Sequence, residues 1–213
     1  MDELEKLKTD WKKNRDNFPR FSEKEIYAML HRRSSSIVKW ILIVSILEFT
    51  LWLGLSFLLK DAKSVKMIDS YGIDFITIPL TVISYAIIVY FVAKFYINYK
   101  KITTTDNVKT LMDNILKTRR TVMIYIYVNL AYIFISSFII FLIIINYDSN
   151  FISLHKKSEA NGNEAMFYII YIISTIFFLA VFVGAIWLFY KLIYGLLLKR
   201  LHKNYEELKK IDL

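Results

Sequence analysis

The chain has 213 residues, of which 56% are hydrophobic, and it combines a mean hydropathy of +0.40 with a formal net charge of +9. Soluble domains are about 45–50% apolar, so this composition excludes an ordinary soluble domain. Cysteine is absent and the three histidines all lie outside the apolar runs, which excludes disulfides, thiolate metal sites and a histidine-rich metal centre inside a membrane.

The N-terminal segment, residues 1–36, is predicted to be cytoplasmic and to form amphipathic helices. Its first apolar residues recur at helical spacing on a strongly charged background. Further along, Ser22 and Glu25 fit the S-x-x-E capping box, which predicts the start of a helix that continues toward the first apolar run. The apolar residues of the two helices, which form the predicted docking face, are Leu4, Leu7, Trp11, Ile26, Met29 and Leu30.

Four apolar runs are each long enough to cross a bilayer, which needs about 20 residues per helix. None alternates as a barrel strand does, so the predicted fold is an all-α membrane protein with four transmembrane helices and amphipathic cytoplasmic extensions. The predicted spans are 37–59, 75–97, 121–147 and 167–190. The segments between and after them are outer loops at 60–74 and 148–166, a cytoplasmic amphipathic helix at 98–120, and a cytoplasmic helical tail at 191–213.

Lysine and arginine predict the orientation of these spans. Nine lie in residues 1–36 and six in 98–120, but only three in 60–74 and two in 148–166. Short cytoplasmic loops carry the excess of positive charge in membrane proteins, so both termini are expected to be cytoplasmic. This asymmetry also accounts for the net charge, and no direct contact with nucleic acid is expected.

The cytoplasmic helices have two interpretations. An amphipathic helix can bury its apolar face in lipid headgroups or in a small bundle with its neighbours, or it can present that face to a partner protein. The outer loops are short and unpatterned, which does not favour a receptor domain on that side. Recognition is therefore expected on the cytoplasmic side.

Glu48 lies near the middle of the first apolar run. An unpaired ionised carboxylate at the centre of a bilayer costs at least about 2.5–3.5 kcal/mol. Counting inward from the cytoplasmic ends of the spans, the residues level with Glu48 are neutral hydrogen-bonding groups, which favours a protonated carboxyl that holds the helices together. A proton- or cation-coupled role is the alternative. The predicted polar cluster is Glu48, Ser45, Ser84, Tyr85, Tyr132, Ser136 and Thr175.

Other chemistry is not apparent in the sequence. No Ser/His/Asp set, glycine-rich phosphate loop, metal-spaced ligand group or pair of intramembrane acids can be assembled from it. The chain is therefore expected not to be an enzyme and to use no cofactor or metal.

The first quarter of the chain resembles short inner-membrane proteins of flavobacteria and their relatives. The resemblance rests on Trp11-Lys12-Lys13, Phe18-Pro19, Glu25-Ile26-Tyr27, and the run from Ser34 to Trp40. Such proteins are often encoded beside an extracytoplasmic-function sigma factor, so the resemblance implies an anti-sigma-like regulator in the bacterial inner membrane. The chain departs from well-known anti-sigma families, since it has neither a zinc-binding His/Cys set nor a single span.

Two functional hypotheses follow. The first is a non-enzymatic inner-membrane protein whose cytoplasmic helices dock a soluble regulatory partner such as a sigma factor. The alternative is an oligomeric pore, a transporter, or a membrane effector of a defence system that uses Glu48. A homo-oligomer is the arrangement expected for the pore.

Overall fold

The protein is a bundle of long helices in the computed structural model, which describes residues 4–5, 8–9, 22–105 and 107–210. No strand occurs in these ranges. The helices are α2 (Glu23–Leu59), α3 (Lys63–Asp69), α4 (Asp74–Thr103), α5 (Val108–Tyr147), α6 (Ser149–Ala160) and α7 (Glu164–Lys209). Of these, α2, α4, α5 and α7 are long and apolar enough to span a membrane, which is the composition of a multi-pass membrane protein.

The start of α2 has the capping box that the sequence predicts. Ser22 Oγ accepts a hydrogen bond from the Glu25 backbone N–H, and the Glu25 carboxylate accepts one from the Ser22 N–H at 2.8 Å. These bonds favour the ionised form and hold the pKa of the Glu25 carboxyl below its ordinary value. From this cap α2 continues without a break into the first apolar run.

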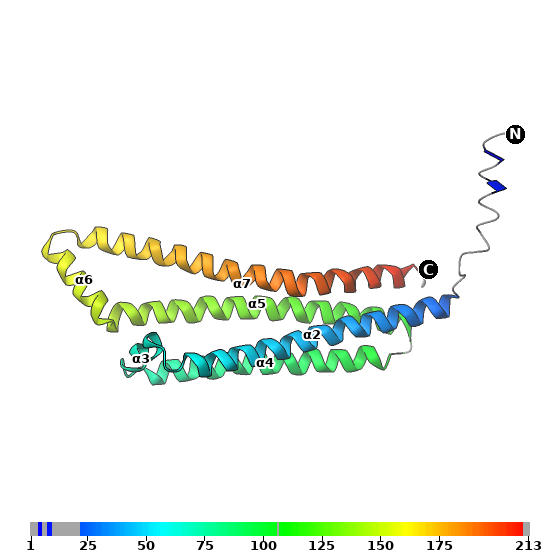
Figure 1. Ribbon diagram of the computed structural model, residues 1–213, viewed down its shortest axis with the longest axis horizontal. Coiled ribbons are helices and arrows are strands. Elements are labelled where there is room, and N and C mark those ends of the chain that lie inside the picture. Colours follow the sequence, from blue (N-terminus) through cyan, green and yellow to red (C-terminus); the bar gives the residue numbers. More distant parts are fainter. Residues whose placement is uncertain (1–3, 6–7, 10–21, 106, 211–213) are drawn as a thin grey trace.

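The four long helices form a ring in which neighbours are antiparallel. α2 packs against α4 and α7, and α5 completes the ring by packing against the same two helices. Both termini of the described bundle and the α4–α5 connection lie at one end, while α3 and α6 lie at the other (Figure 1). The connection between α4 and α5 is short, and the Asn107 side chain caps α5 by accepting from the Lys109 N–H at 2.8 Å.

Close packing is concentrated in the half of the bundle that carries the termini. The fully buried apolar residues of this half come from all four long helices: Val38, Ile41, Phe95, Ile102, Leu111, Ile115, Val122, Tyr125, Tyr194, Leu201 and Leu208. In the other half most apolar side chains are exposed, and no residue in the most apolar window of α7 is buried. The helix α7 diverges from α5 toward this end (Figure 1).

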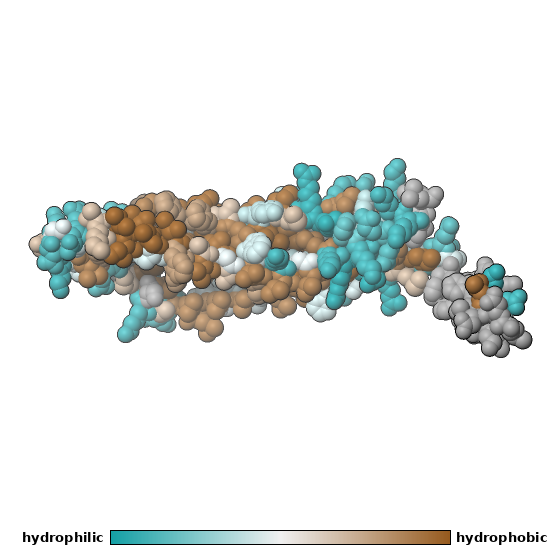
Figure 2. Space-filling view, turned by 90° about the horizontal axis from the view of Figure 1, so that it is seen from above, coloured by the Kyte–Doolittle hydropathy of each residue, from teal (hydrophilic) through white to brown (hydrophobic). Residues whose placement is uncertain are grey.

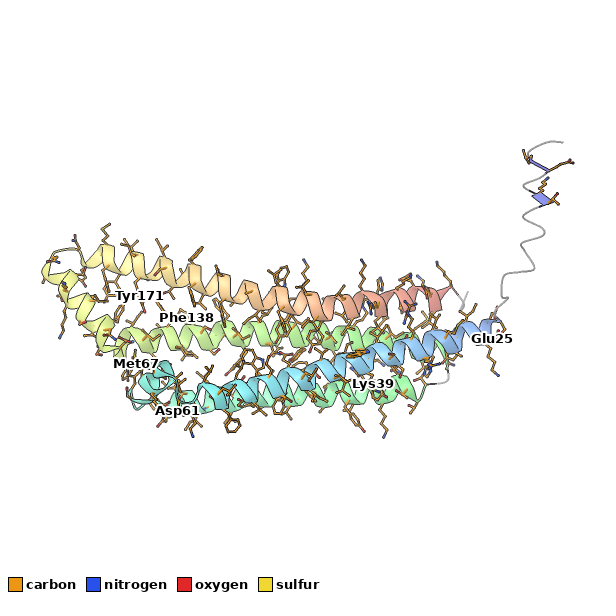
Figure 3. The ribbon with its side chains drawn as sticks, viewed as in Figure 1. Glu25, Lys39, Asp61, Met67, Phe138 and Tyr171 are labelled. Atoms are coloured by element: carbon orange, nitrogen blue, oxygen red, sulfur yellow. The ribbon has the colours of Figure 1, made fainter. Side chains whose placement is uncertain are left out.

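The surface follows the same division. On the face that it draws, Figure 2 shows hydrophobic side chains over the middle of the molecule and hydrophilic side chains at both ends. Among the labelled residues of Figure 3, Glu25 lies at the end with the termini, and Asp61 and Met67 lie at the opposite end, with Lys39 between them. A band of exposed apolar surface between two polar ends is the pattern expected of a protein that crosses a bilayer.

The end that carries α3 and α6 is more ordered than expected, because both predicted outer loops contain a short helix. Asp148 starts α6, since its side chain accepts from the Phe151 N–H at 2.9 Å. The same carboxylate accepts a hydrogen bond from the Tyr71 hydroxyl at 3.0 Å, which ties the two connections together. The Phe151 ring packs on Tyr171 of α7, with ring centroids 4.6 Å apart.

Candidate functional site

Glu48 lies on the inward face of α2. The buried residues of this helix recur every three or four positions, and Ser45 and Glu48 continue the series that Val38 and Ile41 belong to. Only 8% of the Glu48 surface is exposed. A buried carboxyl group needs hydrogen-bond partners, so its neighbours determine what the site can do.

Two tyrosines of α7 bind the Glu48 carboxylate. The Tyr190 hydroxyl donates to Oε1 at 2.5 Å, and the Tyr194 hydroxyl donates to Oε2 at 3.2 Å. The two tyrosines are four residues apart, so they lie one above the other on the same face of the helix. Each carboxylate oxygen therefore has its own phenol donor, and the three side chains link α2 to α7.

Tyr125 of α5 completes the group, which we call the Glu48 cluster: Glu48, Tyr125, Tyr190 and Tyr194. The Tyr125 ring meets the rings of Tyr190 and Tyr194 edge to face, with centroids 6.0 and 5.9 Å apart. Its hydroxyl is buried and close to Glu48, but it does not reach a partner with hydrogen-bond geometry. Rings of α4 close the other side, since Phe95 packs edge to face on Tyr125 at 5.4 Å.

Most of the residues expected to surround Glu48 have other partners. Ser45 is fully buried next to Glu48 along α2, but its hydroxyl donates to the Leu42 carbonyl. The remaining expected members lie on other helices: Tyr132 donates to the Leu80 carbonyl, Ser136 donates to the Ile133 carbonyl, the Tyr85 ring contacts Phe49, and Ser84 and Thr175 are half-buried. The structure thus brings together Glu48 and three tyrosines that the counting of depths did not select.

The difference comes from how the helices are placed along one another. The expectation measured depth from the inner end of each apolar run, which paired Glu48 with Thr175 on α7. The actual partner Tyr190 lies fifteen positions further along α7, about 22 Å at the rise of an α-helix. Glu48 is central in the apolar run of its own helix, but it is level with the C-terminal end of the run in α7, where Tyr190 lies.

Two lysines lie near this level without reaching Glu48. Lys191 follows Tyr190 directly, but its Nζ lies over the Trp187 ring, 4.7 Å from the centroid. Lys94 lies between the cluster-facing aromatics of α4, and its Nζ lies over the Tyr90 ring at 5.5 Å. Both ammonium groups therefore interact with rings of their own helices, and neither neutralises the carboxylate.

A groove of about 630 Å³ runs between α2 and α7 beside the cluster. Glu48 and Tyr190 lie in its wall, and the rest of the lining is apolar apart from the indole of Trp52. The other α2 residues of the lining include Val44, Leu47 and Leu51, and those of α7 include Phe182 and Phe189. The volume falls within the range of about 300–1,000 Å³ that is usual for small-molecule sites, so the groove is the candidate functional site.

The predicted docking face lies partly inside the bundle. Leu30 is buried and belongs to the core, and Ile26 is half-buried against it, whereas Met29 and Leu4 are exposed. The two remaining residues of that face, Leu7 and Trp11, lie outside the described residues. In this arrangement the helix of residues 23–36 packs part of its apolar face, Ile26 and Leu30, against its neighbours, as the bundle interpretation expected.

Polar contacts between neighbouring helices, from residues far apart in the sequence, hold this part of the bundle together. The Asn204 amide donates to Ser34 Oγ at 3.1 Å, and both residues are fully buried. His31 Nε2 lies 2.7 Å from the Ile102 carbonyl oxygen. Among the described residues, no group of three or more histidine, aspartate or glutamate side chains could hold a metal ion.

Comparison with known proteins gives a family match. The model of a family described as "Domain of unknown function (DUF8845)" matches residues 24–213. Neither the curated proteins nor the solved structures contain a match. Because the matched region includes all four long helices and nearly the whole chain, the protein belongs to the DUF8845 family.

Proposed function

We propose that this chain is a non-enzymatic, multi-pass protein of the bacterial inner membrane that regulates a soluble partner. In this proposal, both termini are cytoplasmic, the cytoplasmic part of the bundle docks the partner, and the groove beside Glu48 is the part that responds to the membrane. The observation that carries the proposal is the link from Glu48 to Tyr190 and Tyr194.

The position of this link supports coupling between the two halves. On one side of it lies the loosely packed half with the groove, and on the other lies the closely packed half with the termini. Both linked helices are continuous through this level, since α2 runs from Glu23 to Leu59 and α7 from Glu164 to Lys209. A ligand that displaces α7 from α2 at the groove would therefore shift the cytoplasmic ends of the same helices.

Charge supports the proposed orientation and the kind of partner. The end with the termini carries most of the lysines and arginines, including the exposed pairs Arg32–Arg33, Lys100–Lys101 and Lys199–Arg200. The positive-inside rule assigns that end to the cytoplasm. A basic surface there complements an acidic partner protein. The resemblance of the first quarter of the chain favours a sigma factor as that partner.

A transcription reporter tests the proposal in the host bacterium. The reporter depends on the sigma factor under test, and it is measured in the wild type, in a strain that lacks the chain, and with Arg32→Gln/Arg33→Gln. The deletion and the double variant should both raise transcription. The matched control, Lys156→Gln/Lys157→Gln in α6, removes the same charge at the opposite end and should leave transcription unchanged.

The same experiment distinguishes the alternative. If the deletion leaves every such reporter unchanged, while the purified chain passes protons or small cations across liposomes, the protein is an oligomeric pore, a transporter or a defence effector. The observation that favours this alternative is the same buried carboxylate, since ionisable groups inside a membrane often line transport pathways.

A further inference from the structure

Glu48 has hydrogen-bond donors but no counter-ion in the part of the chain that the structure describes. Its two donors are neutral phenols, and the residues that line the groove include no lysine, arginine or histidine. The ammonium groups of Lys94 and Lys191 lie over aromatic rings instead. The negative charge of an ionised Glu48 is therefore left to be balanced by a proton or by a cation that enters the groove.

The lining of the groove suits one kind of cation. Four aromatic residues contribute to it: Trp52, Phe182, Phe189 and Tyr190. The face of an aromatic ring attracts a positive charge, most strongly when water is excluded. The rest of the lining is largely aliphatic, which favours hydrophobic substituents and disfavours a hydrated metal ion.

The entrance of the groove also favours a hydrophobic ligand. Its edges are exposed apolar residues, with Leu47 61% and Leu51 53% exposed on α2, and Phe189 50% exposed on α7. These side chains are part of the exposed apolar surface of α2 and α7, two of the helices long and apolar enough to span a membrane. A ligand that reaches the groove through this surface must itself partition into lipid.

From the uncompensated carboxylate, the aromatic lining and the apolar entrance, we infer that the groove binds a lipophilic organic cation, with the single positive charge of the ligand against Glu48. This inference rests on the proposed role of the groove as the part that responds to the membrane, and it names the class of ligand. A neutral acyl chain would also fill the apolar lining, but it would leave the carboxylate without a counter-ion, so it is the competing outcome.

Tetraphenylphosphonium and its anionic counterpart tetraphenylborate provide a matched pair of probes, because they have nearly the same shape and opposite charge. The full-length chain in phosphatidylcholine nanodiscs is dialysed against each probe, with empty nanodiscs as the partition control. Saturable binding of about one cation per chain is expected, and no saturable binding of the anion.

Three variants assign the binding to the groove. Glu48→Gln removes the charge and should weaken binding of the cation at least about tenfold, or 1.4 kcal/mol. Trp52→Leu removes one ring and should weaken it about two- to fivefold. Glu159→Gln, which removes an exposed carboxylate in α6, is the control and should bind like the wild type. Melting temperatures show whether each variant is folded. If Glu48→Gln does not fold, Trp52→Leu still tests whether the cation binds in the groove.

The results separate this inference from the proposed function. Equal saturable binding of both probes, or a folded Glu48→Gln variant with unchanged affinity, would overturn the inference in favour of a site for neutral acyl chains. If the cation binds in a way that depends on Glu48 but the deletion leaves every transcription reporter unchanged, the inference about the groove holds and the proposed regulatory function is rejected.

Discussion

The Tyr190 hydroxyl donates a hydrogen bond of 2.5 Å to Glu48 Oε1, and this contact joins residues 142 positions apart in the chain. It joins α2 to α7 at the level where the closely packed half of the bundle ends. With the Tyr194 bond on the other oxygen, it leaves the carboxylate with two neutral donors and no cation among the described residues. Structure and candidate function therefore depend on the same side chains.

The two tyrosine bonds should contribute unequally to stability. Tyr190→Phe removes the shorter bond and should lower the free energy of unfolding by about 0.6–1.7 kcal/mol, the usual range for hydrogen bonds between membrane helices. Tyr194→Phe removes the 3.2 Å bond and should cost less. Melting curves in detergent measure both. Tyr96→Phe changes an exposed ring and is the control. A Tyr190→Phe variant with the same melting temperature as Tyr96→Phe would contradict the structure.

Substitutions of Glu48 distinguish a structural from a proton-carrying role. Glu48→Gln keeps the size of the side chain and one oxygen acceptor, so it should melt close to the wild type. Glu48→Leu leaves two buried hydroxyls without an acceptor and should melt lower. If Glu48 carries protons, the Gln variant will be folded but will have lost proton flux in liposomes, because an amide cannot release the charge. Unchanged flux in a folded Gln variant excludes Glu48 as the proton carrier.

The half of the bundle that carries the termini should depend on its apolar core. Leu201 is fully buried in α7, and Leu201→Ala should lower the free energy of unfolding by about 2–5 kcal/mol through lost contacts and the cavity left behind. Leu192 on the same helix is 65% exposed, and Leu192→Ala should change it by less than about 0.5 kcal/mol. Denaturation in detergent compares the two. Similar effects would mean that the helices of this half do not pack as described.

Acid should loosen the start of α6 through Asp148. Hydrogen bonds from the Phe151 N–H and from Tyr71 hold the pKa of this carboxyl below its ordinary value of 3.8. A group whose folded pKa is lowered stabilises the structure above the ordinary value, and this stabilisation is lost as the pH falls through the folded pKa. After correction for the intrinsic rate, the protection of the Phe151 amide against hydrogen exchange should therefore increase as the pH rises to about pH 4, the region of the ordinary pKa, and be constant above it. Asp148→Ala should abolish that gain.

The proposed topology predicts opposite sides for two reporter fusions. A fusion after Asn150, in the first turn of α6, should report the outside, and a fusion after Leu213 should report the cytoplasm. Paired reporters that are active only on one side of the membrane, such as a phosphatase and a fluorescent protein, measure this. The same side for both fusions would contradict a four-span arrangement with cytoplasmic termini.

The sequence by itself determined the local features of this protein. Four apolar runs separated by charged segments require four long helices, because only a helix satisfies its own backbone within a single apolar segment. The capping box at Ser22 and Glu25 lies within four residues, so its outcome did not depend on the rest of the fold. The apolar spacing of Ile26 and Leu30 likewise identified a face to be buried, without identifying what buries it.

The tertiary structure alone decided which residues meet. The partners of Glu48 depend on the position of α7 along the axis of α2. An apolar run in the sequence shows which part of a helix is hydrophobic, but it does not show how that helix is placed along its neighbour. Counting depths from the ends of the runs therefore selected Thr175, whereas packing brought Tyr190 and Tyr194 to the carboxylate. The same packing buried Leu30 inside the bundle and left the groove open between α2 and α7. Helix formation depends on residues that are close in the chain, whereas the side-chain contacts between helices link residues that are distant in it, so only the tertiary structure decides them.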